Sequence, residues 1–272
     1  MTRKNNNTSS PIHTFVILAY KKSEFLESCI KSILTQSVES KIILATTTPT
    51  PFIKTLAEKY HLDLVIGKHT TIGGDFDFAW HQAATPLVTI AHQDDIYEKD
   101  YTKNIIKSFH SHSDSLIIFT DYYEIRGHAK VYSNSLLKIK RILLTPIRVK
   151  SSLKSTFSKR LIIRFGDSIC CPSVTLMRER CPDIIFTSDL KCNVDWSAWE
   201  LLSKTPGAFT FVDQPLMGHR ISESSTTSKI INAGIRTKED YLILKKFWPT
   251  WIARLITRFY ARSEKSNNLN KT

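Results

Sequence analysis

Short apolar runs alternate with helical patterns through the first 120 residues, and this alternation is the strongest constraint on the fold. The predicted strands cover 15–19, 41–45, 62–66, 87–91 and 115–120. Helices are predicted from an N-cap at Ser23 onward and over 52–60, 76–84 and 100–110, with a loop at 71–75. Such alternation predicts an α/β fold with a mostly parallel sheet flanked by helices.

Polar residues follow three of these predicted strands. Tyr20 follows the first, Thr46 follows the second, and residues 93–95 follow the fourth. Ligands of open parallel sheets bind beyond the carboxyl ends of the strands. We therefore expect these residues to converge on one crevice.

The second half of the chain has a looser pattern and a strongly basic composition. The formal net charge of +13 is concentrated in residues 126–272, and residues 126–164 include many Lys and Arg but no Asp or Glu. Helical turns are predicted within this basic stretch, a helix over 195–203 and a short strand over 209–212. The charge favours an anionic partner such as nucleic acid, phospholipid headgroups or a phosphate-bearing substrate.

Composition also limits the class of protein. A hydrophobic content of 42% favours a packed core over global disorder. Residues 1–11 are polar without a following apolar stretch, so we expect no secretory signal, and no apolar run is long enough to span a bilayer. These features predict a cytoplasmic protein. The five cysteines include no Cys-x-x-Cys pair, which favours small buried thiols over a zinc site.

The motif with the clearest chemistry is His92-Gln93-Asp94-Asp95-Ile96-Tyr97, which ends the fourth predicted strand. Mg²⁺ in proteins is commonly held by one or two carboxylates together with substrate phosphates. Taken alone, an Asp-Asp pair before a helix is more often a turn or an N-cap. Its place at the inferred crevice favours the metal-diphosphate interpretation.

Two further segments carry candidate site residues. Asp195 precedes Trp196 and Trp199, and it is either the N-cap of the following helix or a general base in apolar surroundings. His219 and Arg220 either bind phosphate or lie in a solvated loop, and Arg can bind phosphate through two donors. Local spacing leaves both alternatives open.

The C-terminal region is predicted to form a basic amphipathic helix. Arg254, Arg258 and Arg262 share one helical face. The opposite face is expected to hold apolar and aromatic side chains: Trp251, Ile252, Leu255, Ile256, Phe259 and Tyr260. Such a helix suits either a membrane interface or docking onto the protein core.

A set of short motifs occurs in a fixed order along the chain: Leu18-Ala19-Tyr20-Lys21, Ser32-Ile33-Leu34-Thr35-Gln36, His92-Gln93-Asp94-Asp95 and Val194-Asp195-Trp196. Together they resemble the family 2 glycosyltransferases, which have the GT-A fold. In that family the corresponding places hold a Pro-Thr-Tyr-Asn-like turn, a Ser-Ile-Leu-x-Gln helix end, an Asp-x-Asp-Asp turn and a Glu-Asp motif. The resemblance covers about residues 13–220.

The resemblance implies an inverting transfer of one sugar from a nucleotide-diphosphate sugar to an acceptor hydroxyl. The implied acceptor is a glycan of bacterial cell-surface polysaccharide synthesis, and the basic second half of the chain favours a lipid-linked one. Tyr20 would flank the nucleotide base with Ala19 beside it, while Gln93 and Asp95 would contact the donor. Asp94 would bind a divalent cation, Mg²⁺ or Mn²⁺, and Asp195 would be the catalytic base.

Three positions depart from the family pattern. Thr46 stands where the second strand usually ends in an Asp that contacts the base. His92 replaces the first Asp of the metal motif, and Phe76-Asp77 replaces an Arg-Asn pair. We therefore expect Asp75 and Asp77 to make altered donor contacts. His219 and Arg220 are expected to bind phosphate or the acceptor.

These interpretations divide the chain into five segments. We expect a disordered N-terminus at 1–11, a nucleotide-sugar-binding half at 12–125 and an acceptor-binding half with the base at 126–232. Basic amphipathic helices are expected at 233–262 and a disordered tail at 263–272. The basic region predicts peripheral attachment to anionic lipid at the inner face of the cell membrane. The Gln-x-x-Arg-Trp signature of processive synthases is absent from the sequence, which favours single-sugar transfer.

Two other classes of function fit parts of the sequence. The basic half suits a nucleic-acid- or membrane-binding protein without catalysis, although no aromatic-interleaved basic strand supports nucleic-acid binding. Asp94 and Asp195 would be the carboxylate pair of a glycoside hydrolase. The strand-end crevice and the motif order favour the glycosyltransferase.

Overall fold

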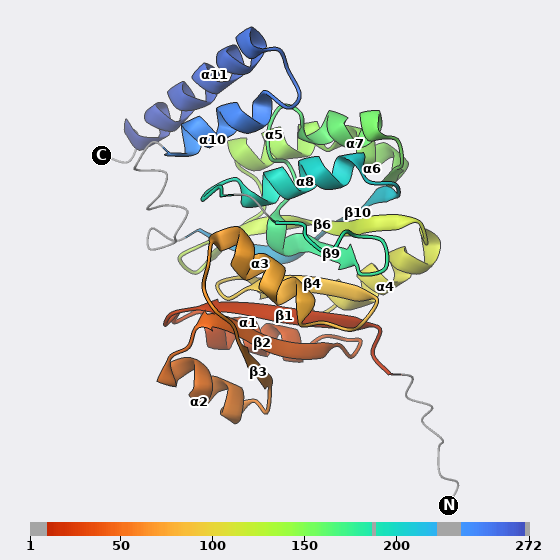
Figure 1. Cartoon of the computed structure of the whole chain (residues 1–272), viewed down its shortest axis with the longest axis vertical. Coiled ribbons are helices and arrows are strands. Elements are labelled where there is room, and N and C mark those ends of the chain that lie inside the picture. The colour runs from red at the N-terminus through yellow and green to blue at the C-terminus, as the bar shows by residue number, and fades with distance from the viewer. Residues whose placement is uncertain (1–9, 187–188, 222–234, 270–272) are drawn as a thin grey trace, which may run out of the picture.

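The computed structural model describes residues 10–186, 189–221 and 235–269, and Figure 1 shows a central sheet with helices on both sides. The described chain forms a ten-stranded sheet whose main order is β3-β2-β1-β4-β9-β6-β10-β5. Strands β1 to β4 are parallel, β9 runs antiparallel between β4 and β6, and β10 is parallel to β6. The predicted α/β fold with a mostly parallel sheet is confirmed.

The strand bounds extend most of the predicted runs. The main path consists of β1 (His13–Tyr20), β2 (Lys41–Thr48), β3 (Asp63–Ile66), β4 (Leu87–His92), β5 (Ile96–Tyr97), β6 (Ser115–Arg126), β9 (Val174–Met177) and β10 (Ala208–Ile221). Two short strands lie off this path, β7 (Ala129–Val131) on β6 and β8 (Ser152–Leu153) on β10.

The described helices are α1 (Leu26–Leu34), α2 (Pro51–Lys59), α3 (Ile72–His81), α4 (Tyr101–Ser111), α5 (Ser135–Leu143), α6 (Thr145–Lys150), α7 (Thr156–Ile163), α8 (Val194–Lys204), α10 (Ile235–Leu244) and α11 (Thr250–Leu269). A 3-10 turn, η1 (Cys171–Ser173), precedes β9. The helical turns expected in the basic stretch are α5, α6 and α7. The predicted tail at 263–272 overlaps the backbone of α11 and ends outside the described residues.

Alternating side chains of the strands point to two separate cores. On β1, Phe15 and Ile17 pack with α1, α2 and α4, while Val16 packs on the other face with α3, α7 and α8. A strand directs successive side chains to opposite faces of its sheet, so continuous apolar runs fit strands that are buried on both sides. Among the described helices, none is long and apolar enough to cross a membrane.

Three local predictions are wrong. The segment at 71–75 is not a loop, because α3 begins at Ile72 and the Thr71 side chain caps it by accepting the Gly74 N–H. Ser23 is not the N-cap of α1; the helix begins at Leu26, with Phe25 at the cap position and no side-chain cap bond. The short strand at 209–212 is part of the much longer β10, which extends to Ile221.

Candidate active site

The turn after β4 is fixed to the end of β1 by the side chain of Gln93. Its Nε2 donates to the Tyr20 carbonyl at 3.0 Å, and its Oε1 accepts the Tyr20 N–H at 3.1 Å. These two hydrogen bonds extend the pairing of β1 with β4, and the Gln93 side chain takes the place of a strand backbone in them. Gln93, predicted to contact the donor, therefore holds the turn that carries Asp94 and Asp95 at the crevice edge.

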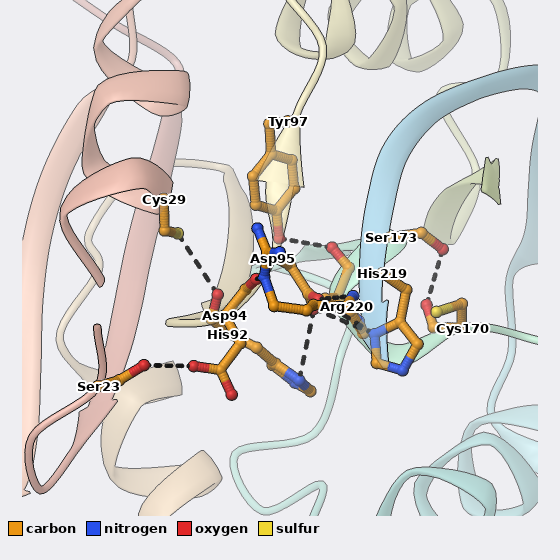
Figure 2. A network of polar contacts seen from close by, with 11 residues as sticks. Ser23, Cys29, His92, Asp94, Asp95, Tyr97, Cys170, Ser173, His219 and Arg220 are labelled. Atoms are coloured by element: carbon orange, nitrogen blue, oxygen red, sulfur yellow. Dashed lines mark hydrogen bonds and ion pairs between the residues drawn. The ribbon is translucent and has the colours of Figure 1, made fainter. Parts of the chain in front are cut away.

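Asp94 projects from this turn toward the start of α1 (Figure 2). Its Oδ1 accepts a hydrogen bond from Ser23 Oγ at 2.6 Å, and its Oδ2 has no hydrogen-bond partner among the described residues. Ser23 thus orients the carboxylate instead of capping the helix. One oriented carboxylate with a free oxygen fits a Mg²⁺ or Mn²⁺ ion whose other ligands are water and diphosphate oxygens.

Asp95 is buried, with only 1% of its surface exposed, and it is bound by residues of β10. Its carboxylate accepts the Arg220 N–H at 2.8 Å and contacts His219 Nδ1 at 3.1 Å. Burial raises the pKa of this carboxyl, but the His219 charge and these hydrogen bonds outweigh burial and lower the pKa below its usual value. For His219, burial lowers the pKa, but the charge and hydrogen bond of Asp95 outweigh burial, so the pKa lies above its usual value. The buried Asp95 and the partly exposed His219 form an ion pair.

Strand pairing explains why His219 and Arg220 reach the turn. The short β5 follows the Asp-Asp turn and pairs antiparallel with β10, placing Ile96 opposite Gly218. A Cβ atom at Gly218 would lie 2.7 Å from the Tyr123 ring, so the close approach of β10 to β6 at this point requires glycine. His219 and Arg220 therefore lie on a strand, and the solvated-loop interpretation is wrong.

Arg220 joins the turn to the region before α1. Its Nε donates to the Asp94 carbonyl at 2.9 Å, and its guanidinium carbon lies 4.2 Å from the centre of the Phe25 ring. This geometry stacks the cation on an aromatic face next to the candidate metal ligand. The position supports a phosphate-binding role for Arg220, which stays a prediction.

His92 takes the place of a carboxylate in the expected metal motif. Its Nε2 is buried and has no hydrogen-bond partner in the part of the chain that the structure describes. Burial lowers the pKa of the imidazole, against the opposing charges of Asp95 and Asp195. A neutral His92 packed edge-on to the Phe76 ring at 5.3 Å leaves Asp94 as the carboxylate with a free oxygen in this turn.

The other predicted donor residues on β1 and β2 differ in exposure. Ala19 is 1% exposed, and Thr46 is fully buried with its hydroxyl accepting the Thr48 N–H at 3.1 Å. Tyr20 is 37% exposed, and its ring centre lies 6.2 Å from that of His69. Among these three positions, Tyr20 is the one that presents a side chain to a ligand.

Asp75 and Asp77 lie on α3 and have different partners. One Asp75 oxygen binds His69 Nδ1 at 2.7 Å, while its buried Oδ1 has no partner among the described residues. Asp77 Oδ1 accepts the N–H groups of Ile185 and Phe186, each at 3.0 Å. Asp77 therefore anchors a loop, and Asp75 keeps an acceptor atom available.

Asp195 lies in the first turn of α8, after the N-cap residue Asn193, so the N-cap interpretation is wrong. Its Oδ1 accepts the Trp196 N–H at 2.8 Å. The α8 start is fixed by Glu239 of α10, whose carboxylate accepts three successive N–H groups, from Lys191 at 2.7 Å, Cys192 at 2.8 Å and Asn193 at 3.1 Å. Burial lowers the pKa of His92, and the charge of Asp195 is among the effects that oppose this shift.

The sequence analysis singled out neither Asp167, in the loop after α7, nor Lys140 of α5. Burial and then the charge of Asp195 raise the pKa of Asp167 well above its usual value. Burial lowers the pKa of Lys140, and the charges of Tyr122, Asp167 and Asp195 oppose that shift. Asp167 is the first acidic residue after the long basic stretch, which was the one signal in the sequence.

The structure bears on two further predictions, the binding of a divalent cation and the burial of the cysteine thiols. No group of three or more His, Cys, Asp or Glu side chains suited to a metal occurs within the described ranges. A cation here would therefore depend on Asp94 and on the phosphates of a ligand. Four of the five cysteines, Cys29, Cys170, Cys171 and Cys181, are buried free thiols, as expected for small core residues.

The sequence matches no protein-family model and no curated protein. Solved structures are similar to it in fold. Staphylococcus aureus TarS 1–349 in complex with UDP-GlcNAc matches with a TM-score of 0.62 and 14% identity over 90% of this chain and 70% of that chain. Full-length S. aureus TarS matches with a TM-score of 0.55 and 12% identity, and the alignment covers 90% of this chain and 42% of that one.

An archaeal enzyme gives a similar result. The mannosyltransferase PcManGT from Pyrobaculum calidifontis, in complex with GDP-Man and Mn²⁺, matches with a TM-score of 0.59 and 11% identity, covering 92% of this chain and 70% of that chain. At these identities the likeness concerns the fold. The chain has the mixed α/β GT-A fold of these glycosyltransferases.

Proposed function

We propose that this protein is a family 2-type inverting glycosyltransferase that moves one sugar from a nucleotide-diphosphate sugar to a hydroxyl of a glycan acceptor. The observation that carries the proposal is the position of two carboxylate sites within a GT-A fold. Asp94 and Asp95 lie at the end of β4, and Asp195 lies at the start of α8. The proposal also rests on the nucleotide sugars bound by the similar structures.

The turn after β4 would bind the donor. Tyr20 supplies an exposed ring for the nucleotide base, and Arg220 supplies a guanidinium beside the turn for the diphosphate. Asp94 would hold Mg²⁺ or Mn²⁺, which offsets the negative charge of a departing diphosphate. Asp95 is already bound by His219 and Arg220, so its role is to hold β10 against the turn.

Asp195 would accept the proton of the acceptor hydroxyl. As that oxygen forms its bond to the anomeric carbon, the bond from this carbon to the diphosphate breaks, and its electron pair leaves with the nucleotide. Attack from the face opposite the leaving group inverts the configuration. A positioned base commonly contributes about 10²–10⁴-fold to such a rate.

The acceptor is proposed to be a lipid-linked glycan of cell-surface polysaccharide synthesis, met at the inner face of the cytoplasmic membrane. Helix α11 supports this: Trp251, Leu255 and Phe259 are 69%, 57% and 73% exposed, next to the exposed Arg254 and Arg258. Side chains elsewhere on α11 pack inward, and Ala253 is fully buried. The helix thus both docks on the core and exposes an apolar stripe, so the expected single apolar face is divided.

The first test is a thermal-shift screen of nucleoside diphosphates and nucleotide sugars, with and without Mn²⁺ or Mg²⁺. A ligand at about 100 times its Kd stabilises the fold by about 2.7 kcal/mol, which is a shift of roughly 5–10 °C for a chain of this size. We expect at least one nucleotide to give such a shift with metal present. Asp94→Asn should remove the metal dependence, whereas Asp63→Asn, on the exposed start of β3, should leave it intact.

The second test concerns the base. Asp195→Asn should bind the donor like the wild type and lose at least about 10²-fold in kcat. If no nucleotide shifts the melting temperature with either metal, the donor site is wrong. If Asp195→Asn transfers sugar at the wild-type rate, the base is wrong.

Membrane attachment has a separate test. Sedimentation with anionic vesicles should capture the wild-type protein, and the double variant Trp251→Ser, Phe259→Ser should stay in the supernatant. Both side chains are exposed, so the fold should tolerate the change. Equal capture of the two proteins would exclude α11 as the attachment site.

A further inference from the structure

Helices α5, α6 and α7 carry large apolar side chains on their exposed faces. Leu136, Ile139 and Ile142 of α5 are 52%, 53% and 68% exposed, Val149 of α6 is 79% exposed, and Phe157 of α7 is 73% exposed. We call these five residues the α5–α7 surface. Scattered exposed apolar side chains are common on proteins, but a group of them on successive helices marks an interaction site.

The pattern on α5 is reversed relative to an ordinary surface helix. Leu136, Ile139 and Ile142 are three residues apart, so they lie on one side of the helix. Charged and polar residues normally occupy the solvent side of such a helix. Here the cation Arg141 lies on the opposite side, where its Nε donates to Asp121 Oδ2 of β6 at 2.9 Å. The apolar stripe therefore faces outward while a cation binds the sheet.

The three helices are firmly packed, so loose docking does not explain this exposure. Leu137 of α5, Ile147 of α6 and Ile162 of α7 are buried in the cores below. Each of the three helices also contacts the other two. The α5–α7 surface is thus the outer face of one well-packed helical layer.

The charge of this layer is positive. Residues 126–164, which include all three helices, contain no Asp or Glu. Two acidic residues from other segments are already paired with it, Asp213 with Arg148 at 2.9 Å and Asp114 with Lys154 at 2.8 Å. These two ion pairs leave the other cations of the layer unbalanced.

Lys138 and Lys150 place unpaired positive charge next to the apolar side chains. Both are exposed, and neither forms an ion pair within the part of the chain that the structure describes. Lys138 directly precedes Ile139, and Lys150 directly follows Val149. A Lys side chain can lay its apolar stem along such a surface and keep its ammonium in water. Apolar side chains flanked by cations match a layer of anionic headgroups above acyl chains.

We infer that the α5–α7 surface enters the headgroup region of an anionic phospholipid membrane, as a second contact besides α11. Binding at a membrane interface strengthens with the apolar area buried and with attraction to anionic lipid. Helices α5 and α11 come close at the loop after α7, where a Cβ atom at Gly166 would meet the Tyr260 hydroxyl at 2.5 Å and Leu143 at 3.9 Å. Figure 1 shows α5 to α7 at the same end of the molecule as α11. The inference extends the proposed membrane attachment and does not depend on sugar transfer.

The charge is tested by sedimentation with two kinds of vesicle. Mixed vesicles of phosphatidylcholine and phosphatidylglycerol should bind the wild-type protein, and vesicles of phosphatidylcholine alone should bind it about tenfold more weakly or less. Each Lys or Arg near an anionic surface strengthens binding by about fivefold. The double variant Lys138→Gln, Lys150→Gln should therefore bind the mixed vesicles about tenfold more weakly than the wild type or less.

The apolar contact is tested by a triple variant, Ile139→Ser, Ile142→Ser, Phe157→Ser. Its affinity for the mixed vesicles should fall at least about tenfold, because three apolar side chains no longer leave water on binding. All three are exposed, so its melting temperature should stay within about 2 °C of the wild type. Ile142→Trp should bind at least as tightly as the wild type, since Trp favours membrane interfaces. The matched control is Leu34→Ser, at the exposed end of α1, which should bind like the wild type.

Several outcomes would overturn the inference. Wild-type binding by the triple variant, equal binding of the wild type to both kinds of vesicle, or no binding to the mixed vesicles would each contradict it. If gel filtration without lipid shows a wild-type dimer and a monomeric triple variant, the surface is an interface between copies and the inference is wrong. If the vesicle results are as expected but no nucleotide sugar is used, the proposed function fails and the membrane surface stands.

Discussion

The ion pair between the buried Asp95 and the partly exposed His219 offers a quantitative test of how β10 is held to the Asp-Asp turn. Asp95→Asn keeps the size of the side chain and an oxygen for the Arg220 N–H, but it removes the charge that faces His219. A buried hydrogen bond to a charged group contributes about 1.5–3 kcal/mol to stability. We therefore expect the free energy of unfolding to fall by about 2 kcal/mol at pH 6, a factor of roughly 30 in the folding equilibrium.

The effect should depend on pH. The pKa of His219 is raised in the folded state, so its part of the stabilisation is complete below the unfolded pKa of about 6.5 and is lost as pH rises through the raised value. The pKa of Asp95 is lowered in the folded state, so its part is present above the unfolded pKa of about 3.8 and is lost as pH falls through the lowered value. Both groups are charged near pH 6, where the pair is strongest.

Urea unfolding followed by tryptophan fluorescence measures this difference at pH 6 and pH 9. The loss caused by Asp95→Asn should be smaller at pH 9, because His219 is then less protonated. The control is Asp63→Asn, which removes an exposed ion pair with Lys41 at 3.7 Å and should cost less than about 0.5 kcal/mol at either pH. An equal loss for Asp95→Asn at the two pH values would show that the His219 charge does not contribute.

Three further outcomes follow from the described contacts. Asp77→Ala should lower the free energy of unfolding by about 1–3 kcal/mol in urea titrations, because two backbone N–H groups lose their acceptor. Gly218→Ala should cost about 1–3 kcal/mol and weaken nucleotide binding, measured by calorimetry, since the added methyl group meets Tyr123. Burial lowers the pKa of His13 to about 3. The unfolded chain therefore gains a proton first as pH falls, and about 2 kcal/mol of stability should be lost between pH 8 and pH 5, but not in His13→Gln.

Much of the sheet was predictable from the residues. Buried strands such as β1 and β4 have continuous apolar runs, and their pattern is local because each strand packs on both faces. The start of α3 was missed because the Gly73-Gly74 pair suggested a loop, although Thr71 provided a cap signal. The length of β10 was missed because Asp213, Gln214 and Pro215 interrupt its apolar pattern.

Some features of the candidate site could likewise be predicted from the sequence, and others could not. The positions of Asp94, after β4, and of Asp195, in the first turn of α8, were predictable because each lies in a short motif at one end of a regular element, and their roles stay predictions. The roles of Ser23, Gln93 and Asp77 were not, because each depends on which backbone or side-chain atom lies opposite. Hydrogen bonding is short-ranged and directional, so a shift of one residue in register would change every such partner.

The sequence by itself determined the alternating strands and helices, the acidic turn after the fourth strand and the basic character of the second half. Strand alternation and helical spacing are properties of neighbouring residues, and parallel strands bring their carboxyl ends together whatever the loops contain. Only the tertiary structure decided that His219 and Arg220 meet Asp95. Those contacts join segments far apart in the chain, and they follow from the pairing of β5 with β10.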